Sequence, residues 1–257
     1  MQEDPAVPQY DFQRLRVACR ECTLFQLCLP VGVSESDLDI LESIIRRRRP
    51  VQRGEYLFQM GEPFESIFAV RSGSVKTYTL TEDGREQVTG FHLPGELVGL
   101  DAIGHGRHAC TAKALETTSV CELPYAQLEE LWSRIPNLPR QLVRIMSKEV
   151  LHDQMLMTLL GKKSAEERLA SYLLSLSTRL AQRGFSSHEF NLSMSRNDIG
   201  NYLGLAVETV SRVFTRFQDE KVLTVQRRNV RIHDLAALRR LSSASGAARV
   251  SMPSAAG

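Results

Sequence analysis

Three cysteines near the start of the chain are close enough in sequence to bind one metal centre. Cys19, Cys22 and Cys28 follow the spacing Cys-x2-Cys-x5-Cys. Thiolate sulfur binds both zinc and iron–sulfur clusters, and both kinds of centre usually take four protein ligands. A fourth thiolate could come from Cys110 or Cys121. The spacing alone predicts a metal site and leaves open whether it holds zinc or iron and sulfur.

A second set of residues, 196–215, has the pattern of a DNA-binding helix-turn-helix. Gly200 is small where two helices must cross closely, and Gly204 lies in the turn, which needs an unusual backbone angle. Apolar residues occupy the positions at which the two helices would pack together: Ile199, Leu203, Leu205, Val210 and Val213. Agreement across this short window predicts a helix-turn-helix.

The second helix of this unit carries side chains that could read a base pair. Glu208, Ser211 and Arg212 project from one face at i, i+3 and i+4. Because arginine can donate two hydrogen bonds to guanine and glutamate can accept one from cytosine, we predict base reading rather than a simple helix ion pair. Arg216, one turn further on, and Arg196, at the start of the first helix, are predicted to contact phosphates.

The charge distribution also favours a nucleic-acid partner for this end of the chain. The net charge is +2, but residues 1–161 carry 17 Lys and Arg against 22 Asp and Glu, a net of −5. Residues 162–240 carry 14 against 8, a net of +6. Within them, Leu223–Ile232 is expected to form a hairpin around Arg227-Arg228-Asn229. Such a basic hairpin beside a helix-turn-helix predicts a wing that lies against phosphates.

The elements that must position these groups change character along the chain. Residues 50–125 alternate turn signals with short runs rich in β-branched and aromatic residues, which predicts a small barrel or jelly roll. The expected strands are Tyr56–Met60, Ile67–Arg71, Val75–Leu80 and Gln87–His92. Helices are expected from Ser34 to near Pro50, Leu138 to Leu160, Ser164 to about Arg183, 195–203 and 207–219.

The long predicted helix has two apolar faces. One has the spacing of a coiled-coil seam and consists of Val143, Met146, Val150, Asp153, Met157 and Leu160. The other, with Leu142, Ile145, Leu156 and Leu159, can pack on the chain's own domains. We expect the seam to meet a second copy of the chain. Asp153 would then face its own image, and because like charges repel in a low dielectric, the seam would be poised between monomer and dimer.

Composition excludes other classes of protein. No run approaches the roughly 18 apolar residues of a transmembrane helix, and the acidic first residues do not resemble a secretory signal. We therefore expect a cytoplasmic protein whose cysteines do not form structural disulfides. No nucleophile motif, phosphate-binding loop or zinc-protease helix is found, so an enzyme is not expected.

Five stretches together resemble a known family. They are Cys-x2-Cys-x5-Cys at 19–28, TGFHLPGELVGLDAIG at 89–104, ALETTSVCELP at 114–124, AEERLA at 165–170 and DIGNYLGLAVETVSR at 198–212. Over about residues 17–235 the chain resembles the CRP/FNR superfamily, and specifically the FNR/Anr type of anaerobic regulator. The resemblance implies an α+β fold. We expect an N-terminal cysteine arm at 1–33, followed by a jelly-roll-like β-roll sensor domain at 34–136. A dimerisation helix at 137–161 would then lead to a winged helix-turn-helix domain at 162–241 and a disordered tail at 242–257.

The resemblance also implies a cofactor and partners. It implies an oxygen-labile [4Fe-4S] cluster that supports a DNA-binding homodimer, with ligands at Cys19, Cys22, Cys28 and Cys121. The DNA site would be a palindrome resembling TTGAT, four bases, ATCAA. The turn at Asp83-Gly84-Arg85 resembles a loop that contacts RNA polymerase, although Arg85 replaces an acidic residue there. Cys110 matches no ligand of the family.

Three other functions compete with this one. Cyclic-nucleotide receptors of the superfamily hold the cyclic phosphate with an Arg-Ser pair, which the stretch Gly106–Cys110 lacks. Because such a bidentate arginine is not replaceable, we expect no cyclic nucleotide. The other two are a constitutive DNA-binding protein stabilised by zinc and a thiol-disulfide switch that uses Cys110 or the arm.

Overall fold

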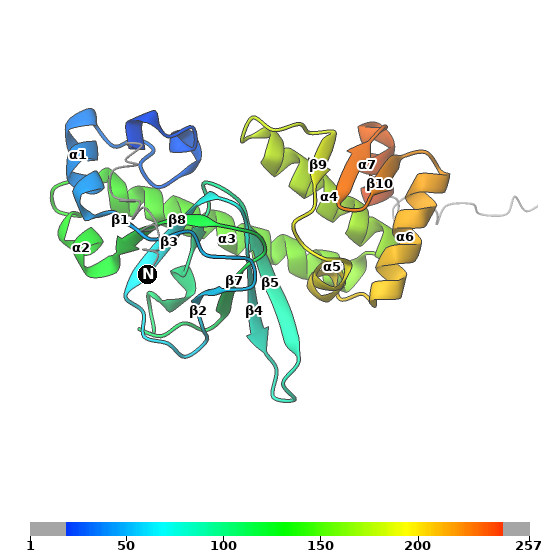
Figure 1. Ribbon diagram of the computed structural model, residues 1–257, viewed down its shortest axis with the longest axis horizontal. Helices are drawn as coiled ribbons and strands as arrows, with labels where there is room; N and C mark the ends of the chain where they lie inside the picture. Colours follow the sequence, from blue (N-terminus) through cyan, green and yellow to red (C-terminus); the bar gives the residue numbers. More distant parts are fainter. Residues whose placement is uncertain (1–18, 244–257) are drawn as a thin grey trace, which may run out of the picture.

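The computed structural model describes residues 19–243, which form a β-rich lobe and a helical lobe joined by one long helix (Figure 1). The first 18 residues of the expected cysteine arm lie outside the described residues. So do residues 244–257 of the expected disordered tail. No helix within residues 19–243 is both long and apolar enough to cross a membrane.

The β-rich lobe consists of two antiparallel four-stranded sheets, with strand orders β1-β8-β3-β6 and β2-β7-β4-β5. All four predicted strands are present, as β2 (Tyr56–Phe58), β3 (Ser66–Ser72), β4 (Val75–Leu80) and β5 (Glu86–His92). The others are β1 (Arg46–Arg47), β6 (Leu97–Val98), β7 (Thr111–Ala114) and β8 (Ser119–Pro124). Inward-facing side chains such as Phe58, Phe68 and Val75 fill the space between the sheets.

Short helical elements lie at either end of this lobe. The arm forms the 3-10 turns η2 (Cys19–Glu21) and η3 (Phe25–Leu27), and η4 (Leu100–Ala102) follows β6. Helix α1 (Glu35–Ile44) is capped by the Ser34 side chain, as predicted, but it ends at Ile44 and does not reach Pro50. It ends there because Arg46 and Arg47 extend to pair with β8. Helix α2 (Tyr125–Glu130) follows β8.

The predicted helices of the second half are confirmed. Helix α3 (Asn137–Lys162) crosses behind the β-rich lobe in Figure 1 and leads into α4 (Ala165–Ala181). Ser164 and Glu167 form the predicted capping box at the start of α4. Helices α5 (Arg196–Leu203) and α6 (Val207–Asp219) form the helix-turn-helix.

A small sheet and one further helix complete the helical lobe. The predicted hairpin is formed by β10 (Leu223–Gln226) and β11 (Asn229–Ile232), with Arg227 at positive φ in its turn. Strand β9 (Glu189–Asn191) pairs with β11, and α7 (Leu235–Ser243) packs on α4. Neither β9 nor α7 was expected from the sequence.

The two lobes share one hydrophobic core. Phe91 of β5 lies against Tyr172 of α4 and Tyr202 of α5, with ring centroids 6.0 and 5.1 Å away. Lys76 of β4 donates a 2.8 Å hydrogen bond to Asp198 of α5. Since these contacts are largely buried, the helix-turn-helix is held against the outer surface of the β4–β5 hairpin.

Candidate functional site

The four cysteines expected to bind metal come from two parts of the fold. Cys19, Cys22 and Cys28 lie in or next to the 3-10 turns of the arm. Cys121 lies on β8, between β1 and β3, where its backbone pairs with those of Arg47 and Ala69. Cys19, Cys28 and Cys121 border the same apolar cluster. One cysteine is therefore fixed by a sheet and three are carried by an irregular segment.

The environment of these thiols opposes their ionisation. Burial raises the pKa of Cys19 and of Cys28 to about 12, and it also raises the pKa of Cys121. The thiols raise one another's pKa as well, because Cys121 acts on both Cys19 and Cys28. Arg47 acts in the opposite direction on Cys19 and Cys121. Without a bound cation Cys19, Cys28 and Cys121 stay protonated, and protonated thiols are poor nucleophiles.

Cys110 lies in a different place. It is buried between the two sheets of the β-roll, where its Sγ is 3.6 Å from Oδ2 of Asp101. Burial, and then Asp101, raises the pKa of Cys110 to about 12. The structure therefore groups Cys121, and not Cys110, with cysteines of the arm.

The donor chemistry of the four cysteines fits an iron–sulfur cluster. Within residues 19–243, no group of three or more His, Cys, Asp or Glu side chains is arranged to hold one metal ion. In a four-iron cluster each cysteine binds a different iron atom, so its four ligands need not converge on one point. Cys19, Cys28 and Cys121 border one apolar cluster and Cys22 follows η2 directly, so the four expected ligands are all thiols, which match the donor chemistry of such a group.

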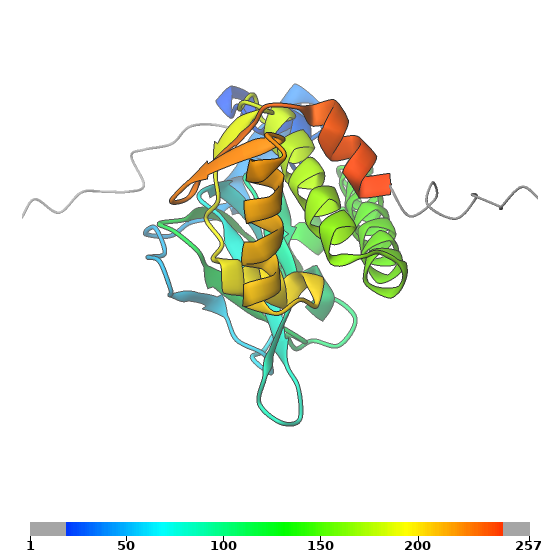
Figure 2. The same ribbon diagram turned by 90° about the vertical axis from the view of Figure 1, so that its right-hand side faces the viewer.

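The helix-turn-helix presents α6 on the outside of the helical lobe (Figure 2). Glu208, Ser211 and Arg212 are exposed, and the opposite face of the helix buries Val210, Val213, Phe214 and Phe217. The turn before α6 needs both glycines. Gly204 has φ of +62°, and a Cβ on Gly200 would be 2.6 Å from the carbonyl oxygen of Leu205.

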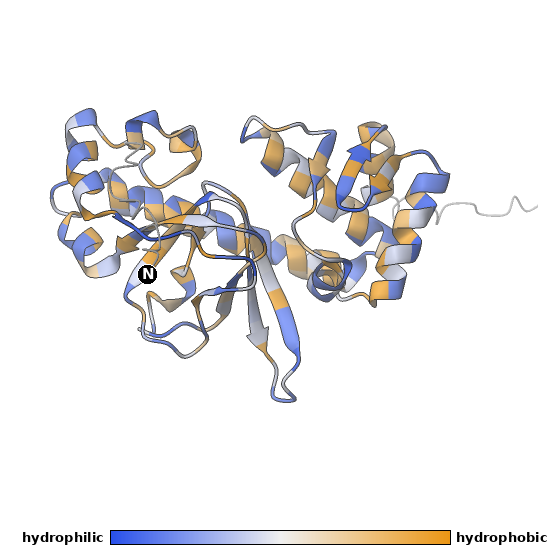
Figure 3. Ribbon diagram, viewed as in Figure 1, coloured by the Kyte–Doolittle hydropathy of each residue, from blue (hydrophilic) through white to orange (hydrophobic). Residues whose placement is uncertain are grey.

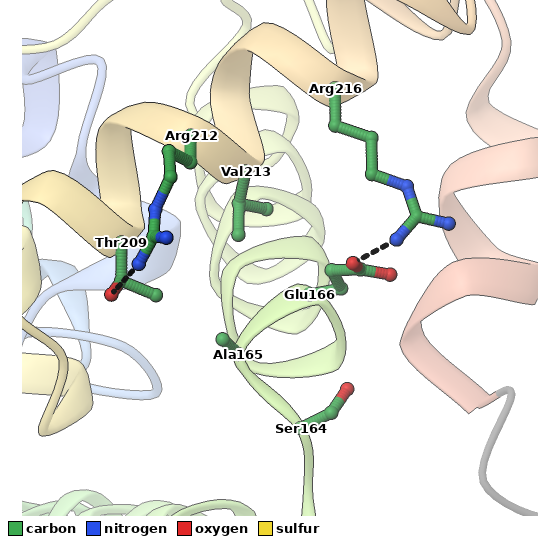
Figure 4. A pocket seen from close by; sticks show the side chains of 7 residues that line it. All are labelled: Ser164, Ala165, Glu166, Thr209, Arg212, Val213 and Arg216. Carbon is green, nitrogen blue, oxygen red and sulfur yellow. Dashed lines mark hydrogen bonds and ion pairs between the residues drawn. The ribbon is translucent and has the colours of Figure 1, made fainter.

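Two arginines of α6 border an open pocket of about 460 Å³ beside the start of α4 (Figure 4). Nη2 of Arg212 donates a 3.2 Å hydrogen bond to Oγ1 of Thr209. Arg216 is paired with two carboxylates, those of Glu166 on α4 and Glu220. Among the described residues Arg212 is thus bound only to a neutral hydroxyl, whereas the charge of Arg216 is largely balanced by two carboxylates.

Arg196, at the start of α5, packs against the recognition helix, and its expected phosphate contact stays a prediction. Its guanidinium carbon lies 3.2 Å from the ring centroid of Phe214, and its Nη1 is buried with no hydrogen-bond partner among residues 19–243. Burial lowers the pKa of Arg196 to about 10. The side chain packs on the recognition helix because Phe214 offers an aromatic face there.

The expected seam forms an exposed apolar row on α3. Val143 and Met157 are each 64% exposed, Val150 is 56% exposed and Met146 37% exposed. Asp153, between them, is also exposed. The second face packs on the chain's own core, as predicted: Leu142 is buried in it and Ile145, Leu156 and Leu159 pack against it. Most of the seam is left open to solvent.

The tip of the β4–β5 hairpin projects away from the rest of the molecule, and Figure 3 shows that it is hydrophilic. Gly84 adopts φ of +77° in this turn. Arg85 donates a 2.6 Å hydrogen bond to the side chain of Asp83. Hydrogen bonds from Thr81 and Arg85 lower the pKa of Asp83. Gly84 and Arg85 are thus displayed on an ordered, protruding turn.

The stretch that holds the cyclic phosphate in nucleotide receptors is differently built here. His108 is buried and stacks on Phe58, with ring centroids 3.6 Å apart. The absence of a cyclic nucleotide stays a prediction.

Comparisons with known proteins identify the family. The family model of the cyclic nucleotide-binding domain matches residues 48–134, and that of the Crp-like helix-turn-helix domain matches residues 167–241. The chain is 54% identical to the transcriptional activator protein Anr of Pseudomonas protegens, over 84% of this chain and 88% of that protein. It is 50% identical to the fumarate and nitrate reduction regulatory protein of Escherichia coli, over 88% of this chain and 90% of that protein.

A solved structure agrees with these matches. FixK2 from Bradyrhizobium japonicum has a TM-score of 0.71 and 34% identity to this chain, and the match covers 77% of this chain and 97% of FixK2. The expected α+β fold, with a β-roll, a long helix and a C-terminal helix-turn-helix, is confirmed. The chain belongs to the CRP/FNR family of DNA-binding transcription regulators and, within it, to the FNR/Anr type.

Proposed function

We propose that this regulator senses oxygen through a [4Fe-4S] cluster bound by Cys19, Cys22, Cys28 and Cys121, and that without oxygen it binds palindromic promoter DNA as a homodimer. The observation that carries the proposal is the placement of Cys121, on a rigid strand, against the same apolar cluster as Cys19 and Cys28. When bound, the cluster would supply an oxygen-labile link between the arm and β8. We further propose that the protein acts in the cytoplasm and has no catalytic role.

The apolar cluster beneath the cysteines offers a route from the arm to the dimer helix. It contains Leu29 and Val33 of the arm together with Leu138 and Leu142 from the first turns of α3. These side chains are almost fully buried, and close-packed interiors transmit displacement. A change in the position of the arm therefore displaces the start of α3, which carries the seam.

The C-terminal end of α3 leads into the helical lobe, so pairing of the seam with a second copy would place two recognition helices on one DNA duplex. Because a symmetric dimer presents them with two-fold symmetry, its site is a palindrome with half-sites one helical turn apart, resembling TTGAT, four bases, ATCAA. Arg212 and Glu208 are exposed for base contacts, with Ser211 between them. The hairpin tip at Gly84 and Arg85 is proposed to contact RNA polymerase on the bound promoter.

Binding of one protein sample to palindromic DNA, before and after exposure to air, tests the proposal. Protein purified without oxygen should shift a duplex that carries TTGAT, four bases, ATCAA, and should not shift a duplex with scrambled half-sites. The same sample should lose the shift after air. Equal binding before and after air would contradict oxygen sensing and favour a constitutive, zinc-stabilised regulator.

A further inference from the structure

Arg168 connects the end of the dimer helix to the helix-turn-helix. Only Lys163 and Ser164 separate α3 from α4. From the first turn of α4, Arg168 donates to the carbonyl oxygens of Leu160 and Lys163, at 2.7 and 2.9 Å. Its remaining nitrogen, Nη1, donates to the carbonyl oxygen of Leu203, at 3.0 Å. One side chain thus bonds to the end of α3, to the joint and to the end of α5.

These hydrogen bonds satisfy groups that helices leave unpaired. The last carbonyls of an α-helix have no partner within the helix and carry a partial negative charge, which a cation there stabilises. The guanidinium group is planar and has several donors in fixed directions, so it can reach three carbonyls from different segments. The single ammonium nitrogen of lysine cannot span them in the same way.

Two further contacts bring α3 and α5 together near the same point. A Cβ on Gly204, in the turn of the helix-turn-helix, would be 3.5 Å from Nη1 of Arg168 and 3.7 Å from Cδ2 of Leu160. About two turns earlier on α3, Nε2 of His152 is 3.0 Å from the hydroxyl of Tyr202 on α5. The last turns of α3 therefore lie directly against the first helix of the DNA-binding unit.

We infer that Arg168 is a positioning residue that makes the regulator discriminate between half-site spacings. The inference rests on the proposed binding of a dimer to a palindrome. If α3 joins two copies and Arg168 locks each helix-turn-helix to its own α3, the separation of the two recognition helices is fixed. Each inserted base pair moves one half-site by about 3.4 Å and rotates it by about 35°. With Arg168 in place, the linker of Lys163 and Ser164 resists this displacement of the half-site. Without Arg168, the same two residues can change conformation and adapt to it.

The test compares full-length protein, purified without oxygen, on duplexes whose half-sites are separated by three, four, five or six base pairs. The wild-type protein should prefer one spacer. In Arg168→Gln the ratio of affinities between the preferred spacer and its neighbours should fall by about 5-fold or more, in the range of typical coupling effects. Arg168→Lys should give a smaller fall. The control, Arg212→Ala, should weaken binding at all four spacers by the same factor.

Equal losses at all spacers in Arg168→Gln would show a merely structural role. An unchanged preference for one spacer would show that the helical lobe is fixed without Arg168. Its position would then be set by the ion pairs of Glu96 with α4 and of Lys76 with α5. Either result overturns the inference. Failure of Arg168→Gln to bind even a single half-site would show that this variant does not fold. The spacer preference of Arg168→Lys then tests the inference in its place. If the wild-type protein shows no preference for palindromes, the proposed function fails instead.

Discussion

Cys121 and Cys110 are only 11 positions apart in the sequence, yet they point into different apolar clusters. Cys121 lies on the side of the β-roll that the arm covers, and Cys110 lies between the two sheets. The apolar surroundings of both thiols raise their pKa. The neighbours of each cysteine, rather than its ionisation, therefore separate an expected ligand from a buried thiol.

Serine substitutions should separate these two kinds of cysteine. Replacing Cys19, Cys22, Cys28 or Cys121 by serine should abolish iron retention, because a hydroxyl does not ionise to replace the thiolate. Cys110→Ser should leave iron retention and anaerobic DNA binding nearly intact. Iron analysis of protein purified without oxygen measures the difference. Equal loss at Cys110 and Cys121 would show that the fourth ligand is wrongly assigned.

Base reading by α6 gives a second prediction at this scale. Arg212→Ala should cost about 1–3 kcal/mol of binding free energy per half-site, as the loss of one bidentate base contact does. Glu208→Val should change which base is preferred at one position of the half-site. Competition between duplexes that differ at single base pairs measures both effects. If Glu208→Val weakens binding equally for every sequence, Glu208 acts only within the helix.

Two arginines have partners within the chain that the sequence does not predict. The phosphate contacts expected of Arg196 and Arg216 from their positions in the helix-turn-helix stay predictions. The partner of Arg216 on α4, Glu166, lies 50 positions away in the sequence, and Arg196 stacks on Phe214. Such pairs depend on how the helices pack together, which local spacing does not reveal.

At the scale of elements, α3 carries the proposed switch in its seam. Asp153→Ala removes the repulsion between facing carboxylates and adds an apolar group to the row of Val143, Met146, Val150 and Met157. The variant should therefore dimerise and bind DNA in air without iron. Sedimentation of the iron-free variant at tens of micromolar measures its state. A monomer there would show that the dimer is controlled elsewhere.

Glu149 on α3 gives the stability of the protein a pH dependence. Burial, and then Glu96, raises the pKa of Glu149 to about 7. The folded chain therefore binds this proton more tightly than the unfolded chain, so the free energy of unfolding falls as pH rises from about 4.5 to 7. Glu149→Gln cannot ionise, so it should stabilise the iron-free protein by about 1–3 kcal/mol at pH 8, and by progressively less towards pH 4.5. Thermal melts across this range measure it, and a gain that is the same at every pH would contradict it.

The helices were largely predictable because each carries its own signals. Ser164 and Glu167 mark the start of α4, and Gly204 marks the end of α5. The small strand β9 was not, because Glu189, Phe190 and Asn191 form a strand only through pairing with β11. Short elements that depend on a distant partner carry little local pattern.

At the scale of the whole molecule, the contact between the lobes was not predictable. Lys76 and Asp198 are 122 positions apart in the sequence. Asn201 donates a hydrogen bond to the backbone of β5, to a residue 115 positions away. No periodicity or motif connects such residues. The helix-turn-helix is therefore held by the β-rich lobe as well as by α3.

The absorption spectrum and iron content of the full chain purified without oxygen test the central claim most directly. An oxygen-labile [4Fe-4S] cluster predicts a straw-brown solution with broad absorption near 400 nm, about four iron atoms per chain, and bleaching in air. Colourless protein, or protein that contains zinc and no iron, would contradict the account.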